Sequence, residues 1–172
     1  MAISAQRQSD SAPRLVKLGA GFAGLQLAKK LRNTAYDITL IDQYNYHQFQ
    51  PLFYQVATAR LEPSSISFPL RKIFQRSKNV RVRNTKVKEI DMAAQQVVTE
   101  DGSFPYDELV IATGCTTNFF GNKNLEQYAF PMKSTTEAIT LRNRILLNFE
   151  DALSATPEEM EEIMNIVVVG GG

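Results

Sequence analysis

A glycine-rich turn near the N-terminus constrains the fold of this chain more than any other feature. Its six residues fit the pattern G-x-G-x-x-G and are Gly19, Ala20, Gly21, Phe22, Ala23 and Gly24. An apolar run precedes the turn, and leucines at helical spacing follow it, so we predict a strand, a tight turn and a helix. Asp42 ends the next apolar run, 18 residues after Gly24. This is close to the spacing expected of an acid that binds a ribose.

Each glycine of this pattern has a physical task in a dinucleotide site. Gly19 permits the tight turn, Gly21 lets a pyrophosphate approach the backbone, and Gly24 lets the helix pack against the strand. The free N–H groups and the partial positive charge of the helix N-terminus attract the phosphates. Asp42 can accept hydrogen bonds from ribose hydroxyls, and its charge would repel a 2′-phosphate. The alternative is a glycine turn in an α/β protein that binds no cofactor.

The remainder of the chain alternates between predicted strands and helices. We expect a third strand at 79–84 and a β-meander from 86, whose last arm runs into an apolar strand ending at Gly114. A capping box predicts a helix from Ser134 to about Leu153, and a second N-cap starts another helix at Thr156. The run 166–169 reads as a final strand. The predicted fold class is therefore α/β with a mainly parallel sheet.

Composition excludes several classes of protein. The chain has 172 residues, of which 44% are hydrophobic, and its formal net charge is +1. The hydrophobic fraction is sufficient for a core. The nearly neutral net charge does not favour a nucleic-acid partner. Cys115 is the only cysteine, so the chain has no disulfide framework and no cysteine cluster for a metal. No stretch fits a signal peptide or a membrane-spanning helix.

The glycine pattern does not distinguish FAD from NAD, but its surroundings help. A meander that leads into "LVIATG" resembles the FAD-binding domain of flavoproteins with two dinucleotide-binding domains. The segment 44–63 contains no cysteine, which excludes the redox dithiol of the glutathione-reductase-like members. We therefore expect a Rossmann-like FAD-binding domain with a three-stranded meander.

Several motifs in order and spacing resemble the type II NADH:quinone oxidoreductases of the pyridine nucleotide-disulphide oxidoreductase superfamily. They are "NYHQFQPLFYQVATA", "LEPSSISFPLRKIF", "TNFFG", "AFPMKSTTEAITLRNRIL" and "NIVVVGGG". The resemblance implies that NADH reduces FAD and that the flavin passes electrons to a membrane quinone, without proton pumping. It also implies a cytoplasmic enzyme, peripheral on the inner membrane surface, with homodimerisation left open. A ferredoxin- or rubredoxin-reductase-like flavoprotein is the alternative, and "QPLFYQVATA" argues against it.

The same resemblance assigns residues to the cofactor and to the quinone. FAD would lie on residues 19–24, with Asp42 on the adenosine ribose and the Val87 backbone at the adenine edge. The flavin half would pass close to Ala112, Thr113 and Gly114. Residues near the flavin and the quinone path would be Gln50, Pro51 and Gln55, although plain core packing is the alternative for this segment. No catalytic residue and no metal ligand is assigned. For His47, the only histidine, we expect a structural hydrogen bond.

Two residues depart from the family pattern. Lys17 stands in the first strand, where a parallel sheet favours an apolar residue. A buried lysine is costly unless it is paired or neutralised, so we expect it to weaken FAD retention. Arg60 stands where a small residue is expected, and it is harmless if its head reaches water.

The resemblance divides the chain into three parts. Residues 1–12 would be a disordered arm, 13–165 the N-terminal part of the FAD-binding domain, and 166–172 the start of an NADH-binding domain. Gly170 and Gly172 would be the first two glycines of the NADH motif. We expect a truncated family member, whose membrane contacts belong to a missing C-terminal part. We expect the 172-residue chain to lack activity by itself, and a non-catalytic FAD-binding module is the alternative.

Overall fold

The computed structural model describes residues 12–170. Gly172 and the arm predicted for 1–12, apart from Ala12, lie outside this range. The chain forms two compact units. The first unit runs to Phe49 and resumes at Ser67–Cys115, while the second comprises Gln50–Ile66 and the residues from Thr116 onward.

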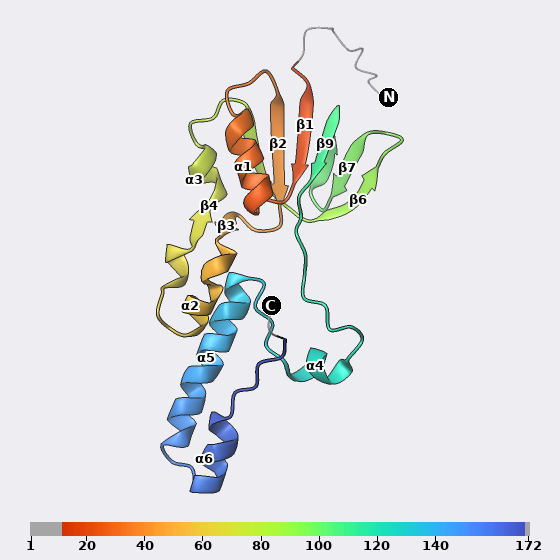
Figure 1. Ribbon diagram of the computed structural model, residues 1–172. Coiled ribbons are helices and arrows are strands. Elements are labelled where there is room, and N and C mark those ends of the chain that lie inside the picture. The colour runs from red at the N-terminus through yellow and green to blue at the C-terminus, as the bar shows by residue number, and fades with distance from the viewer. Residues whose placement is uncertain (1–11, 171–172) are drawn as a thin grey trace. The chain divides into compact units, whose positions relative to one another are not determined.

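A four-stranded parallel sheet forms the centre of the first unit (Figure 1). Its strands are β1 (Arg14–Leu18), β2 (Asp37–Asp42), β5 (Val80–Asn84) and β9 (Glu108–Ile111), in the order β5-β2-β1-β9. Helix α1 (Phe22–Leu31) makes the crossover from β1 to β2. The predicted α/β class with a parallel sheet is confirmed. The strands β2 and β9 lie on opposite sides of β1, so the strand order changes direction at β1. Open parallel sheets bind ligands at such a point, at the carboxyl ends of the strands.

Alternation along β1 places its side chains on the two faces of this sheet. Leu15 packs in a cluster with Leu25 and Ala28 of α1 and with residues of the short helix α3 (Leu70–Phe74). Val16 and Leu18 pack on the opposite face. The sheet is therefore covered by helices on one face, and the meander covers the other.

The meander is a separate three-stranded antiparallel sheet. Its strands are β6 (Val87–Asp91), β7 (Gln96–Thr99) and β8 (Gly102–Pro105). The last strand of the meander, β8, does not continue directly into β9. After β8 the chain leaves the meander: Asp107 N donates to Arg14 O, and β9 then pairs with β1 in the parallel sheet. A small antiparallel pair, β3 (Tyr46–Gln48) with β4 (Ser67–Pro69), completes the unit.

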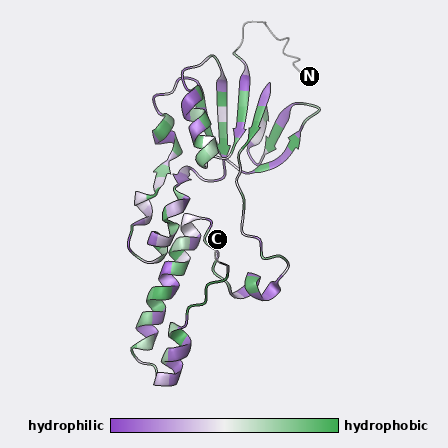
Figure 2. Cartoon of the chain, viewed as in Figure 1, coloured by the Kyte–Doolittle hydropathy of each residue, from purple (hydrophilic) through white to green (hydrophobic). Residues whose placement is uncertain are grey.

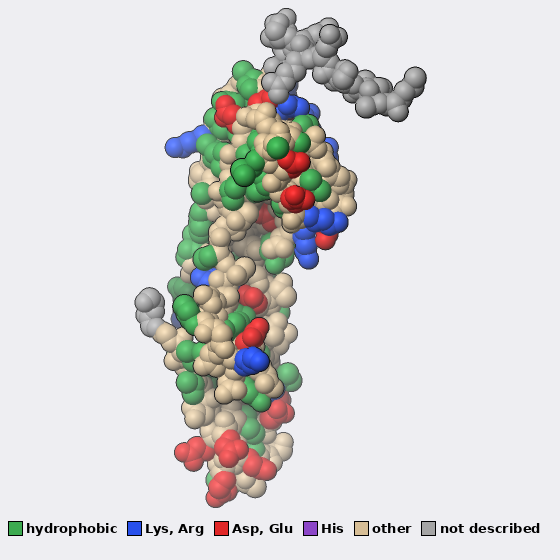
Figure 3. All heavy atoms as spheres, turned by 90° about the vertical axis from the view of Figure 1, so that its right-hand side faces the viewer, with side chains coloured by type: hydrophobic (Ala, Val, Ile, Leu, Met, Phe, Trp, Pro, Cys, Tyr) green, Lys and Arg blue, Asp and Glu red, His purple; other side chains and the backbone are tan. Residues whose placement is uncertain are grey.

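The second unit is helical. It contains 3₁₀ turns at Gln50–Leu52 and Pro63–Ser65 and the helices α2 (Phe53–Ala57), α4 (Lys123–Tyr128), α5 (Thr135–Ala152) and α6 (Pro157–Met164). The core of this unit joins α2 to the start of α5 and consists of Phe53, Val56, Ala57, Ile66 and Ala138. Acidic side chains gather around α6, which carries four glutamates (Figure 3).

Local capping explains where the two longer helices of this unit begin. The Ser134 hydroxyl accepts a hydrogen bond from Glu137 N at 3.2 Å, but the Glu137 carboxylate accepts from Lys133 N rather than from Ser134 N. The predicted capping box of α5 is therefore only half formed. At α6 both bonds between Thr156 and Glu159 are present. The hydrogen bonds from Thr156 lower the pKa of Glu159.

The predicted final strand at 166–169 is not formed. These residues are apolar (Figure 2). Each of them is exposed, by between 63% and 83%. A strand needs a partner for its backbone N–H and C=O groups, and no described segment pairs with this one. Gly170 has a positive φ of 90°, a backbone conformation that suits glycine.

Candidate functional site

A cleft of about 280 Å³ opens at the carboxyl ends of the parallel strands in the first unit. Every parallel strand contributes residues at or just beyond its end. The lining residues are Leu18, Gly19, Ile41, Asp42, Gln43, Thr85, Lys86, Val87 and Thr113. In an open parallel sheet this edge, beside a change in strand order, is where a nucleotide binds.

Two glycines of the turn are required by close backbone contacts. A Cβ on Gly19 would lie 2.3 Å from Ala112 O, and the φ of Gly19 is +91°. A Cβ on Gly24 would lie 2.0 Å from Gly19 O. Both distances are far shorter than van der Waals contact. The turn can therefore have this shape only with glycine at these two positions.

Gly21 is different, because the space beside it is open. A Cβ there would meet no atom within 4 Å, and Gly21 is exposed. Gly21 is also the N-cap of α1, which has neither a side-chain cap nor an acidic residue in its first turn. Its first N–H groups are thus left without a side-chain acceptor and are free to bind an anion.

Asp42 holds the turn while it faces the cleft. Its Oδ2 accepts a hydrogen bond from Ala20 N at 2.6 Å, and its Oδ1 accepts from Tyr44 N at 2.8 Å. A carboxylate has about four acceptor positions, so two remain for ligand hydroxyls. Asp42 can therefore fix the loop and bind a ribose at the same time.

His47 supports the turn from β3. It is buried, and its Nδ1 lies 2.8 Å from Ala20 O. A carbonyl oxygen can only accept, so Nδ1 carries the proton. The ring of Phe22 packs edge-on against His47 and Phe49. His47 thus has the structural hydrogen bond expected of it.

Of the other predicted FAD residues, some line the cleft and some do not. Val87 and Thr113 line the cleft, and Ala112 is in close contact with Gly19. Gly114 is exposed with a φ of +74°. Their roles toward FAD stay predictions, as does the role of Gln50, Pro51 and Gln55, which belong to the second unit.

The cleft wall also contains Gln43, Thr85 and Lys86, which no sequence motif predicted. Thr85 is the most informative of the three. It is 7% exposed, and its Oγ1 is buried without a hydrogen-bond partner. Burying a hydroxyl unpaired is unfavourable, so a partner from a ligand would be favourable. The one signal in the sequence for Thr85 as a cleft residue is its position directly after the predicted strand 79–84.

Lys17 and Arg60 differ in their surroundings. Arg60 is exposed, so its charge stays in water. The Lys17 side chain is fully buried beneath the glycine turn, where burial lowers its pKa to about 8. Its Nζ donates hydrogen bonds to the backbone oxygens of Ala23 and Gly24.

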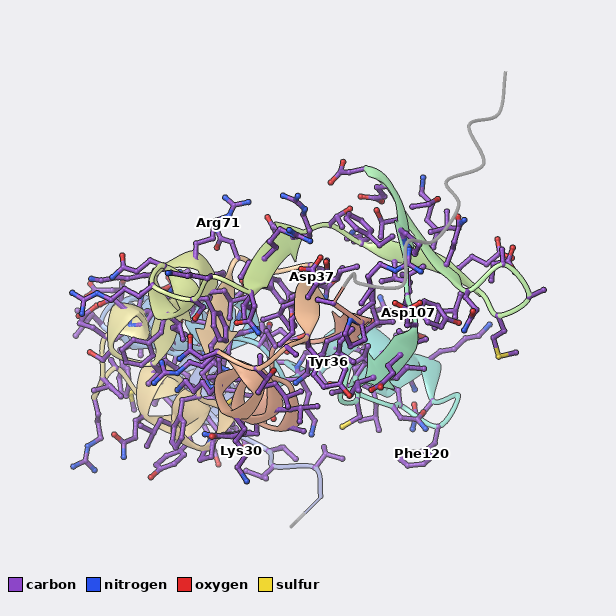
Figure 4. All side chains as sticks on the ribbon, turned by 90° about the horizontal axis from the view of Figure 1, so that it is seen from above. Lys30, Tyr36, Asp37, Arg71, Asp107 and Phe120 are labelled. Atoms are coloured by element: carbon purple, nitrogen blue, oxygen red, sulfur yellow. The ribbon has the colours of Figure 1, made fainter. Side chains whose placement is uncertain are left out.

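At the amino ends of the parallel strands, opposite the cleft, polar side chains pair with one another (Figure 4). Arg14 binds both oxygens of Asp107, at 2.9 and 3.1 Å, and this hydrogen bonding raises the pKa of Arg14. Asp37 forms an ion pair with Arg81. Tyr36 donates from its hydroxyl to Glu108 at 2.9 Å. These pairs connect all four strands of the parallel sheet, β1, β2, β5 and β9, far from the cleft.

Within residues 12–170 no group of three acidic, histidine or cysteine side chains could hold a metal ion. In the same range no helix combines the length and apolar character that crossing a membrane demands.

Comparison with known proteins identifies relatives of this chain. A model of the pyridine nucleotide-disulphide oxidoreductase family matches residues 13–172. The type II NADH:quinone oxidoreductase Ndh of Mycobacterium tuberculosis is 42% identical over 164 residues, which cover 92% of this chain and 35% of that protein. The chain therefore spans about a third of the length of such relatives.

Solved structures share the fold. NDH2 of Plasmodium falciparum in complex with RYL-552 gives a TM-score of 0.81 at 21% identity, covering 87% of this chain and 32% of that one. The sulfide:quinone oxidoreductase of Aquifex aeolicus gives 0.74 at 30% identity, covering 81% of this chain and 33% of that one. The first likeness, at its low identity, concerns the fold alone.

Proposed function

The chain belongs to the pyridine nucleotide-disulphide oxidoreductase family, and from that premise we propose that its first unit binds FAD in an enzyme that passes electrons from NADH to a quinone. The proposal depends chiefly on one observation. The cleft at the carboxyl ends of the strands combines a glycine turn open at Gly21, an acid at Asp42 and an unpaired hydroxyl at Thr85.

These residues fit the adenosine pyrophosphate part of FAD. The open backbone at Gly21 and the uncapped start of α1 suit two phosphate groups. The remaining acceptor positions of Asp42 suit the ribose hydroxyls. Val87, which lines the cleft, would present its backbone to the adenine. The flavin supplies the two-electron chemistry, and this unit binds and orients it.

The choice of NADH and quinone follows the relatives. The protein from M. tuberculosis, 42% identical, is an NADH:quinone oxidoreductase by name, and the one from A. aeolicus, 30% identical, is a sulfide:quinone oxidoreductase. Both names include a quinone as acceptor. The higher identity favours NADH as donor, and we propose that the enzyme works at a membrane surface because its quinone acceptor is a lipid.

Binding of FAD and ADP to the purified 172-residue chain tests the site directly, by isothermal titration calorimetry. We expect both to bind, because ADP contains the part of FAD that the described cleft fits. The Gly21→Ala variant keeps an ordinary backbone, with φ at −66°, and has room for its methyl group. That methyl group would obstruct the phosphates, so we expect the variant to fold normally and to bind about tenfold more weakly. Equal binding by the variant, or no binding by the natural chain, would contradict the proposal.

A further inference from the structure

Dinucleotide binding as described above gives no role to Lys17, which is buried in the first unit. Its side chain is fully buried, on the α1 face of β1, so that its Cε lies 3.7 Å from where a Cβ of Gly24 would stand. Its Nζ donates to Gly24 O and, at 3.5 Å, to Ala23 O. Both acceptors lie in the first turn of α1, so the ammonium lies directly beneath the phosphate-binding turn.

The neighbours of Lys17 on the flanking strands are apolar. Lys17 is in register with Leu40 of β2 and with Val110 of β9, and both belong to the cluster on this face of the sheet. Leu25 and Ala28 of α1 complete that cluster. Two backbone carbonyls are the acceptors of this ammonium, and no carboxylate pairs with it among the described residues.

The charged residues on the same elements lie at their ends. They are Arg14 at the start of β1, Asp37 and Asp42 at the two ends of β2, Glu108 at the start of β9, and Lys29 and Lys30 in the last turn of α1. Burial, not a charged neighbour, lowers the pKa of Lys17. A buried cation without an anionic partner is unfavourable, and an anion bound nearby would offset this cost.

We propose that Lys17 is a positioning residue that supplies a buried positive charge beneath the glycine turn, so that binding of the dinucleotide pyrophosphate is linked to protonation of this lysine. The inference rests on the proposed function, because the pyrophosphate is its anion. It reverses the expectation from sequence that Lys17 weakens FAD retention. The ammonium contributes to binding through the backbone of the turn rather than by touching the phosphates.

Two opposite dependences on pH follow. The pKa of Lys17 in the free folded chain, about 8, lies below its ordinary value of 10.5. Between these values the unfolded chain binds more protons, so stability of the free chain rises with pH. A bound pyrophosphate favours the charged lysine and raises its pKa, so affinity falls as pH rises above about 8. A lysine with a merely structural role would show the first dependence without the second.

The experiment measures FAD and ADP affinity by titration calorimetry in two buffers of different ionisation enthalpy. For the natural chain we expect affinity to fall about tenfold from about pH 7.5 to about pH 9.5, with proton uptake on binding near pH 8.5. Lys17→Met should bind both nucleotides about tenfold more weakly at about pH 7.5. It should show neither the fall of affinity with pH nor the proton uptake on binding. Lys29→Met removes an exposed charge from the same helix and should behave like the natural chain.

The outcomes separate this inference from the proposed function. If the natural chain binds FAD and ADP with no proton uptake and no loss of affinity up to about pH 9.5, the link to Lys17 is overturned while the FAD site stands. Undiminished binding by Lys17→Met would overturn it as well. If the natural chain binds neither nucleotide, both proposals fail. Should Lys17→Met not fold, the pH profile and proton uptake of the natural chain alone decide the question.

Discussion

The two units of this chain are stabilised in different ways. In the first unit, apolar clusters pack on both faces of a parallel sheet, and they join strands far apart in the sequence. In the second unit, the 18-residue helix α5 buries only Thr135 and Ala138. Several large apolar side chains of α5, α6 and the turn between them stay exposed: Leu146, Leu147, Phe149, Leu153 and Met160. The first unit therefore depends on long-range burial, and the second depends more on local helix signals.

The largest expected difference between the units comes from truncating one leucine in each. Leu40 is fully buried in the centre of the first unit, whereas Leu147 on α5 is 55% exposed. We expect Leu40→Ala to lower the free energy of unfolding by about 2–5 kcal/mol, because it leaves a cavity. Leu147→Ala should change it by less than about 0.5 kcal/mol. Urea unfolding followed by circular dichroism measures both.

The matched pair can also break the comparison. A large loss of stability in Leu147→Ala would mean that the apolar side of α5 is covered in solution. Repeating the unfolding at several protein concentrations would then reveal whether a second copy covers it, because an associating chain becomes more stable with concentration.

A smaller effect is expected from removing the cap of α6. Thr156→Ala deletes the hydroxyl that accepts from Glu159 N at 3.3 Å. Loss of an N-cap costs about 1 kcal/mol, and the helix has no buried residue to offset it. Thermal unfolding followed by helical ellipticity should therefore show early loss of α6. Thr156→Ser keeps the cap and serves as the control, and equal melting of the two variants would mean that burial, not capping, holds α6.

No loss of stability is expected from a substitution in the cleft of the first unit. Thr85→Val replaces the unpartnered buried hydroxyl by a methyl group of similar size. The free chain should be unchanged or more stable by up to about 1 kcal/mol, while FAD affinity falls severalfold if the hydroxyl binds the ligand. Calorimetric titration and thermal unfolding together test this. A variant with lower stability and unchanged affinity would show that Thr85 has a structural role instead.

The sequence predicted the parts of the fold that local signals specify. Gly19, Gly21 and Gly24, followed by Asp42, predicted the first strand, turn, helix and second strand, and the structure has them in this order. The signals at Thr156 predicted the start of α6. Predictions were wrong where a distant partner decides the outcome. The run 166–169 has strand-forming residues, yet no strand forms among the described residues, because a strand needs another strand beside it.

By itself, the sequence determined the α/β class, the glycine turn and the family, since these depend on the order of residues along the chain. Only the tertiary structure decided what surrounds each candidate residue. It brought Thr85 and Lys86 to the cleft with Asp42, because parallel strands end at the same edge of a sheet. It also enclosed Lys17 between Leu40 and Val110 beneath the turn. The charge and hydrogen bonding of a buried group depend on neighbours that pairing across the sheet supplies, and no local pattern contains them.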